Sequence, residues 1–245
     1  METSTYAVEA EVEASHWWFV ARRQLIADII AQAAVAPSAR VLDVGTSTGT
    51  NLRLLRDLGF ANRRGLDPSD SAIRWCTEKG LGQVTKGDVC SLPFGDGDFE
   101  LVLATDIIEH VDDDVRAVSE IRRVLAPGGT AIISVPAFRS LWGLQDDVSH
   151  HKRRYRKREL LKVIERAGLT AMESFYFNYL LFAPIWAARQ LIRIAGITLK
   201  SENQVNNGAL NWLLTRIFLA DVATARILRP PFGVSIMAVA RRDSL

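Results

Sequence analysis

The stretch Val41-Leu42-Asp43-Val44-Gly45-Thr46-Ser47-Thr48-Gly49 constrains the fold of this chain more than any other segment. An apolar run that contains an acid leads into two glycines, and a helical pattern follows over residues 51–58. Glycine lets the backbone turn sharply and approach a ligand closely, and the free N–H groups at a helix start bind polar or anionic atoms. The stretch therefore predicts a buried strand, a tight turn and a helix N-terminus, which form the entry to a nucleotide-type cofactor site in doubly wound α/β folds.

The glycine spacing separates this turn from the dinucleotide-binding fingerprint. That fingerprint is G-x-G-x-x-G, whereas the glycines here are Gly45 and Gly49, with three residues between them. Asp43, two residues before the first glycine, can accept hydrogen bonds from a cationic or hydroxyl-bearing ligand. An ordinary turn that uses glycine for its backbone angles is the alternative.

Another acid follows the next expected strand. Gly59 ends helix 51–58 as a C-cap, and Asp67 then ends a second short strand. An acid at that place can accept hydrogen bonds from both hydroxyls of a ribose. The alternative is a turn or N-cap acid before a helix over 69–79. Further elements are expected in this order: a third strand before Gly87-Asp88-Val89, a fourth strand at 99–104, a helix at 112–125 that stops before Pro127, and a fifth strand at 130–135.

Six segments, taken in order, resemble the methyltransferase type 11 group of the class I S-adenosylmethionine (SAM) methyltransferases. They are D-V-G-T-S-T-G, L-D-P-S, G-D-V, D-F-E-L-V-L, E-H-V and V-L-A-P-G-G, and the resemblance covers roughly residues 39–170. Ser47 is a departure, because the family's loop has a third glycine there. The resemblance implies a doubly wound, Rossmann-like α/β fold whose seven-stranded, mostly parallel sheet has a terminal antiparallel strand. It also implies SAM as cofactor, S-adenosylhomocysteine (SAH) as product, and no metal.

The resemblance indicates which residues hold the cofactor. Asp88 resembles the acid that accepts a hydrogen bond from the adenine amino group, and Asp106 and His110 follow the fourth strand near the cofactor. For the latter segment, the start of the next helix is the alternative. The cofactor-binding residues expected in this core are Asp43, Gly45, Thr46, Ser47, Gly49, Asp67, Pro68, Asp88, Val89, Thr105, Asp106 and His110.

The N-terminal residues 1–36 are expected to form a helical lid. The run Ser15-His16-Trp17-Trp18-Phe19 precedes an apolar helix over 24–34. We expect Trp17, Trp18 or Phe19 to shield the sulfonium and Arg22 to reach the SAM carboxylate or an anionic substrate, so Trp18 and Arg22 join the candidate cofactor-binding residues. A helix start packed across the sheet edge is the alternative. The segment His-Trp-Trp-Phe-x-x-Arg-Arg resembles one found in a subset of type 11 relatives, many of which act in glycan, lipid or secondary-metabolite pathways.

The loop after the fifth strand carries the candidate catalytic residues. Histidine is the usual proton acceptor near neutral pH, so His150 and His151 are candidates for a general base, with Tyr155 beside them; relatives show a similar His-x-Arg-Arg-Tyr run. Structural roles for both histidines are the alternative. The basic residues within 152–158 are either a solvated face or an attraction for a phosphate or carboxylate group.

Residues 179–228 are expected to interrupt a terminal antiparallel hairpin. The hairpin comprises strands at 169–178 and 234–241, so the core is 37–178 plus 229–245. The insertion contains Pro184, Arg189 and Arg193, which argue against a membrane-spanning helix. A helical cap over the substrate pocket, a homodimer interface and peripheral membrane contact are its three candidate roles, in that order.

Composition fits one globular enzyme. The chain has 245 residues, a net charge of +2 and 48% hydrophobic residues, which does not indicate a nucleic-acid partner. Cys76 and Cys90 provide neither a disulfide framework nor a metal-binding spacing, and the acidic N-terminus does not resemble a secretory signal. A cytoplasmic location is therefore expected, with the inner face of the membrane as an added site of contact.

The expected reaction is methyl transfer to an oxygen or nitrogen of a small-molecule, glycan or lipid-linked acceptor. The segment Thr105-Asp106-Ile107-Ile108 lacks the Asn/Asp-Pro-Pro-Tyr/Phe motif of methyltransferases that act on DNA adenine or glutamine amides. A catalytically inactive SAM- or SAH-binding partner or regulatory protein is the alternative. An NAD enzyme is disfavoured by the glycine spacing.

Overall fold

The computed structural model describes residues 10–195 and 208–244. Seven strands form one sheet in the order β3-β2-β1-β4-β5-β7-β6. They are β1 (Val41–Val44), β2 (Arg63–Asp67), β3 (Gln83–Lys86), β4 (Phe99–Thr105), β5 (Leu125–Pro136), β6 (Thr170–Phe177) and β7 (Ser235–Arg241). Strands β1 to β5 run parallel, and β7 is antiparallel to both of its neighbours. The doubly wound fold expected from the sequence is confirmed.

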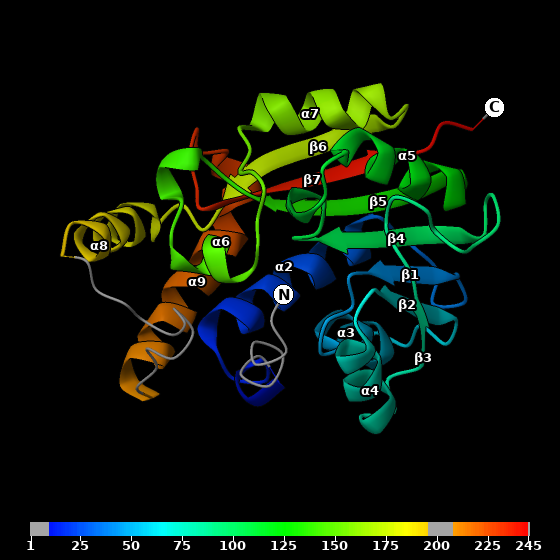
Figure 1. Ribbon diagram of the computed structural model, residues 1–245, viewed down its shortest axis with the longest axis horizontal. Coiled ribbons are helices and arrows are strands. Elements are labelled where there is room, and N and C mark those ends of the chain that lie inside the picture. Colours follow the sequence, from blue (N-terminus) through cyan, green and yellow to red (C-terminus); the bar gives the residue numbers. More distant parts are fainter. Residues whose placement is uncertain (1–9, 196–207, 245) are drawn as a thin grey trace.

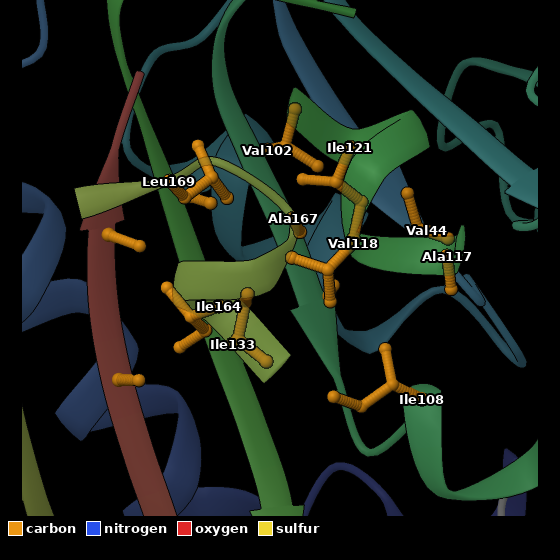
Figure 2. Packing of buried hydrophobic residues seen from close by; sticks show 14 of the residues in the cluster. Val44, Val102, Ile108, Ala117, Val118, Ile121, Ile133, Ile164, Ala167 and Leu169 are labelled. Carbon is orange, nitrogen blue, oxygen red and sulfur yellow. The ribbon is translucent and has the colours of Figure 1, made fainter. Parts of the chain in front are cut away.

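Helices cover both faces of the sheet (Figure 1). On one face lie α5 (Asp114–Val124) and α7 (Lys157–Arg166), whose apolar side chains form a core with residues of β1, β4 and β5, as Figure 2 shows. On the other face lie α2 (Trp17–Gln32), α3 (Thr50–Asp57), α4 (Asp70–Glu78) and α9 (Gly208–Leu228). Because both faces are covered, β1 is buried along its whole length, as expected of a strand in a parallel sheet.

The helix starts follow from local chemistry. Ser69 caps α4 by accepting a hydrogen bond from the Ser71 amide, and Asp113 caps α5 by accepting one from the Arg116 amide. Such caps satisfy amides that have no partner within the helix. The helix that we expected at 112–125 therefore begins after Asp113. The apolar helix expected at 24–34 is α2, which begins earlier, so its first turn contains the aromatic run.

The fifth strand is longer than expected, because the Pro127-Gly128-Gly129 run lies inside it. Leu125 pairs with Phe99 and Thr130 pairs with Leu101, so the register shifts between these pairs and the run bulges out. Gly128 takes a left-handed backbone conformation there, which glycine adopts without steric strain. The turn signal was real, but it marks a bulge in the strand rather than a separate turn before it.

The insertion between β6 and β7 contains α8 (Phe182–Ala195) and α9. α8 lies beyond the end of the sheet toward which β4 and β5 point, near the short helix α6 (Leu144–Val148) (Figure 1). α9 instead packs on α2 and the sheet through Phe218, Val222 and Ala225. Among the helices that the structure describes, none has the length and hydropathy needed to cross a bilayer.

Candidate functional site

A cavity of about 780 Å³ opens at the carboxyl ends of the parallel strands. It lies where β1 and β4 are neighbours and the strand order reverses, the usual binding place in open α/β sheets. Two sets of residues line it. The loop half is formed by Gly45, Thr46, Ser47, Asp67, Pro68, Asp88 and Val89, and the histidine half is formed by Glu109, His110, His151, Arg154, Ile185 and Arg189.

The glycine loop after β1 has left-handed backbone at three positions. Gly45 and Gly49 have φ values of +74° and +93°, and Ser47 has a φ of +49°. A β-carbon on Gly45 would lie 1.7 Å from Cδ1 of Ile107, so glycine is required there by space as well as by angle. Ser47 therefore occupies a glycine-like conformation, which explains why the family's loop has glycine at this position.

Asp67 is held by the loop that it faces. One carboxylate oxygen accepts a hydrogen bond from the Ser47 amide at 2.9 Å, and the other accepts one from the Ser69 amide at 2.8 Å. Burial raises the pKa of Asp67, and these two amides lower it. Each oxygen keeps lone-pair capacity for a further donor, so the carboxylate can accept hydroxyl groups from the cavity.

Asp43 and Gly49 do not line the cavity, in contrast to the other expected cofactor residues. Asp43 is fully buried beneath the loop, where the Asn51 side-chain amide donates to it at 2.9 Å. The same amide donates to the Thr105 hydroxyl at 3.0 Å. Burial raises the pKa of Asp43 to about 7, although the Asn51 hydrogen bond acts in the opposite direction. Asp43 therefore supports the loop and the end of β4 rather than forming the cavity wall.

The first turns of α2 pack against α9 and also line the cavity. This position is compatible with both expectations for the segment, a lid over the cofactor and a helix start packed across the sheet edge. Trp18 stacks on Phe218 of α9 with ring centroids 5.4 Å apart, and it also contributes to the cavity wall. Arg22 is buried and forms an ion pair with the half-buried Asp106, whose other oxygen accepts a hydrogen bond from the Ser134 hydroxyl at 3.1 Å. In the protein alone Arg22 thus pairs with a protein carboxylate, and its role toward the SAM carboxylate or an anionic substrate stays a prediction.

The Glu13 carboxylate links the N-terminal segment to the loop half, a role that no sequence pattern predicts. Its carboxylate is buried and accepts hydrogen bonds from Thr48, from Thr50 at 3.0 Å, from Arg53 at 2.9 Å and from Lys79 at 2.8 Å. In the sequence this residue is one of several N-terminal acids. All its partners lie far along the chain, so no local pattern identifies it.

The structure separates the two adjacent histidines. His151 lines the cavity, and its Nδ1 lies 2.8 Å from Oδ1 of Asp146. His150 is exposed, does not line the cavity and has a left-handed backbone with a φ of +55°. Burial alone would raise the pKa of Asp146, but hydrogen bonds from His151 and Arg154 hold it at about 2.

Tyr155 has structural contacts instead of a cavity position, and of the basic run only Arg154 lines the cavity among the described residues. The Tyr155 hydroxyl donates to Asp114 at 2.8 Å, and the side chain is buried away from the cavity. Burial and the Asp114 charge raise its pKa, which opposes a role as a base. Three cations of the run form ion pairs with acids of this chain: Lys152 with Asp112, Arg153 with Asp114, and Arg154 with Asp146.

Glu109 and His110 lie on the short 3₁₀ helix η1 (Ile108–His110), which follows β4. Glu109 is fully buried, and burial followed by the Asp106 charge raises its pKa well above the usual range. Burial and the neighbouring His151 lower the pKa of His110 to about 4. The sequence places Glu109 at the expected start of the next helix, and the Glu-His pair shortly after a strand is the signal that marks it as a site residue.

A family model described as a methyltransferase domain matches residues 42–133. A 2-methyl-6-phytyl-1,4-hydroquinone methyltransferase from Synechocystis is 29% identical over 150 residues, which are 58% of this chain and 45% of that protein. The segments aligned with the curated relatives span 27% to 48% of the length of those proteins.

Two solved structures share the fold. One comes from a complex of a Haloferax volcanii methyltransferase candidate with the Trm112 methyltransferase activator (21% identity, 99% of this chain and 96% of that chain, TM-score 0.66). The other is the [4+2]-cyclase SpnF (22% identity, 90% and 80%, TM-score 0.60). The family match confirms that residues 42–133 carry a methyltransferase domain of the type 11 group, whose cofactor the sequence resemblance gave as SAM.

Proposed function

We propose that this protein transfers the methyl group of SAM to an oxygen or nitrogen nucleophile of a small-molecule, glycan or lipid-linked acceptor. The observation that carries the proposal is a single cavity with two chemically different halves. The loop half supplies backbone amides and the carboxylates of Asp67 and Asp88, whereas the histidine half supplies imidazoles and the guanidinium of Arg189. A cofactor and an acceptor can therefore lie side by side.

The loop half fits the nucleoside end of SAM. Asp67 is placed to accept the ribose hydroxyls, since it lines the cavity and both its oxygens keep acceptor capacity beside their amide partners. Asp88 and Val89 line the wall beyond it, where the adenine would lie. Thr105 and Asp106, at the end of β4, would lie beside the methionine part of the cofactor.

Methyl transfer needs alignment and exclusion of water more than it needs covalent help from the protein. The acceptor atom attacks the methyl carbon, the carbon–sulfur bond breaks, and sulfur keeps the electron pair, which gives SAH. An acceptor hydroxyl also loses its proton. Trp17, Trp18 and Phe19 cover the cavity from the side of α2, so they would keep water from the sulfonium.

The outward face of α8 favours a lipid-linked acceptor. On this helix Arg189, Gln190 and Arg193 donate hydrogen bonds to backbone carbonyls of residues 140–142. Several large apolar side chains face solvent instead: Trp186, Leu191 and Ile194 are 43%, 66% and 82% exposed. A helix with this arrangement leaves a large apolar face without a covering partner.

The charges around this face favour an anionic membrane. Arg193 on α8 and Arg216 on α9 are exposed. Within residues 179–194 and 208–232 the only carboxylate is Asp221, which is buried and accepts hydrogen bonds from the amides of Asn178 and Leu180. Apolar side chains with flanking cations suit binding to anionic lipid. We propose contact at the cytoplasmic face of a membrane, close to the cavity that Ile185 and Arg189 of α8 help to line.

The methylation proposal is tested by product analysis. The purified protein is incubated with SAM and with glycan- and lipid-pathway extracts, and SAH and methylated product are measured by mass spectrometry. SAH that forms only with an extract supports the enzyme. SAM binding without turnover on any extract supports the inactive binding protein instead. The [4+2]-cyclase of the same fold illustrates that the fold alone does not decide this point.

The membrane proposal is tested by flotation with anionic and neutral vesicles. We expect the protein to float with anionic vesicles, and we expect the variant Leu191→Ser/Ile194→Ser to lose this binding. The matched control is Met172→Ser, which changes an apolar side chain that is 59% exposed on β6. A dimer that dissociates in the double variant, together with no flotation, would assign the face to a second copy of the chain.

A further inference from the structure

Three side chains with metal-binding atoms meet in the histidine half. Glu109, His110 and His151 each offer one ligand atom, and these atoms all lie within 4.8 Å of one another. Two residues come from η1, and the third comes from the loop that follows α6. All three line the cavity, so a group held between them would be accessible to a bound acceptor.

The Glu109 carboxyl group lacks hydrogen-bond partners among the described residues. It is fully buried, and the lack applies to both of its oxygens. A buried polar group without a partner is destabilising. The nearby guanidinium of Arg154 donates to Asp146 and to the Ala137 carbonyl instead. The site therefore leaves place for a positive group beside Glu109.

Hydrogen-bond partners on the side away from the proposed ligand site orient the imidazoles of His110 and His151. Nδ1 of His151 contacts Asp146, which is itself fixed by Arg154 and the Gly143 amide. The other ring nitrogen of His151 is then the one left to offer to a ligand. The Ser149 backbone hydrogen-bonds His110, and the two rings lie 4.6 Å apart at 83°. A carboxylate or carbonyl behind each ligand histidine is the usual outer shell of a metal site.

We propose that Glu109, His110 and His151 bind a divalent transition-metal ion such as Zn²⁺, Co²⁺ or Mn²⁺. Two imidazoles and one carboxylate suit these ions, and three protein ligands leave coordination positions open for water or substrate. The family resemblance implies no metal, so the site goes beyond it. A bound ion would provide the partner that the Glu109 carboxylate lacks. His151 would then be a metal ligand rather than a general base.

The metal has a specific use in methyl transfer, and this part rests on the proposed function. A divalent ion that binds the acceptor oxygen lowers its affinity for the proton, which passes to solvent. The resulting oxyanion attacks the methyl carbon, and sulfur keeps the electron pair of the broken bond. The site thus favours an oxygen acceptor with a second oxygen that can also reach the ion, such as a vicinal diol or a catechol.

The test measures metal binding without turnover. Tag-free protein is stripped with a chelator and titrated with Co²⁺, whose visible absorption reports imidazole and carboxylate ligation, and with Zn²⁺ in a calorimeter. We expect one ion per chain. Glu109→Gln and His151→Ala should each weaken binding more than about 100-fold, beyond the 10–100-fold typical of outer-shell changes. His150→Ala is the matched control, because this adjacent histidine lies outside the cluster, and it should bind normally.

SAM affinity measured on the same samples distinguishes the outcomes. Unchanged SAM binding in the variants shows that they are folded, and His151→Ala keeps the test decisive if Glu109→Gln does not fold. Absence of stoichiometric Co²⁺ and Zn²⁺ binding to the unaltered protein would overturn the metal site, as would binding that survives both cluster substitutions. Metal binding without any SAM-dependent turnover would support the site and contradict the proposed methyl transfer.

Discussion

The two halves of the cavity are built in opposite ways. The loop half is formed by short local segments at strand ends, and backbone amides hold its key carboxylate, Asp67. The histidine half is formed by side chains from separate parts of the chain, and a buried ion pair between Asp146 and Arg154 holds it. The first construction suits a ligand common to a family, whereas the second can differ from one chain to the next.

The largest effect is expected from Asp146→Ala, which removes the support of the histidine half. The substitution leaves Arg154 buried without its carboxylate, and breaking a buried pair this way costs about 3–5 kcal/mol. Urea denaturation should show this loss, while SAM affinity changes little because the loop half is intact. Asp147→Ala, one residue away and exposed, is the control. A strong loss of SAM affinity in a folded Asp146→Ala protein would mean that the halves are not independent.

Glu13→Ala should have the next effect, because it unfastens the N-terminal segment from the loop half. Arg53 and Lys79 lose a buried partner, and we expect a loss of about 3 kcal/mol of unfolding free energy together with weaker SAM binding. Glu11→Ala removes an exposed acid of the same segment and should change neither quantity. Equal behaviour of the two variants in denaturation would remove Glu13 from this role.

Asp67→Ala probes the loop half directly. Two charge-assisted hydrogen bonds to a ribose would be lost, each contributing about 1.5 kcal/mol, so calorimetry should show SAM affinity reduced by about 100-fold. Asp70→Ala is the control, since this acid lies on the surface and pairs with Lys86. SAM affinity that does not change in Asp67→Ala would place the ribose elsewhere.

Asp43→Asn tests the buried carboxyl group beneath the loop half through the pH dependence of stability. The native pKa of Asp43 is about 7, above its ordinary value of 3.8, so the native state holds a proton that the unfolded state has already released. The stability of the unaltered protein should therefore fall as the pH rises through this window and level off above about 7. The Asn variant lacks this group. Denaturation at pH 5 and pH 8 should show the variant gaining on the order of 2 kcal/mol relative to the parent at the higher pH; a constant difference would mean that Asp43 is ionised throughout.

Ser47→Gly should give the smallest effect, and it is a stabilising one. The left-handed backbone at Ser47 costs an L-residue about 1 kcal/mol that glycine avoids, although the more flexible unfolded chain offsets part of this gain. The thermal midpoint should rise by a few degrees. Ser71→Gly, inside α4, should lower it. A lower midpoint for Ser47→Gly would show that side-chain contacts of Ser47 outweigh the backbone strain.

Sequence predicted the loop half because its signals are local. The glycines, Asp67 and Asp88 each stand next to the strand whose end they occupy, so strand order alone brings them together. The same reasoning gave the sheet and the terminal hairpin. It missed the bulge at Pro127-Gly128-Gly129, because the register of β5 depends on a partner strand.

The histidine half escaped sequence reasoning because its contacts are long-range. His151 was expected at the site, but the pattern could not separate it from His150, whose side chain is exposed. The sequence made Tyr155 a catalytic candidate beside these two histidines, but its hydroxyl donates a hydrogen bond to Asp114 of α5. Burial and unpaired oxygens distinguish Glu109, and both properties exist only in the folded chain.

The insertion leaves the sheet and re-enters it at one point. Phe177, the last residue of β6, is paired with Ser235, the first residue of β7. The two ends of the intervening segment are therefore neighbours, and its length is almost irrelevant to the strands, since closing a longer loop adds little entropy. Because α9 packs on α2 and the sheet, the part of the segment that is free to change is the one that contains α8. Acceptor preference can therefore diversify by changes within one short contiguous stretch of gene, while the strands and the loop half stay the same.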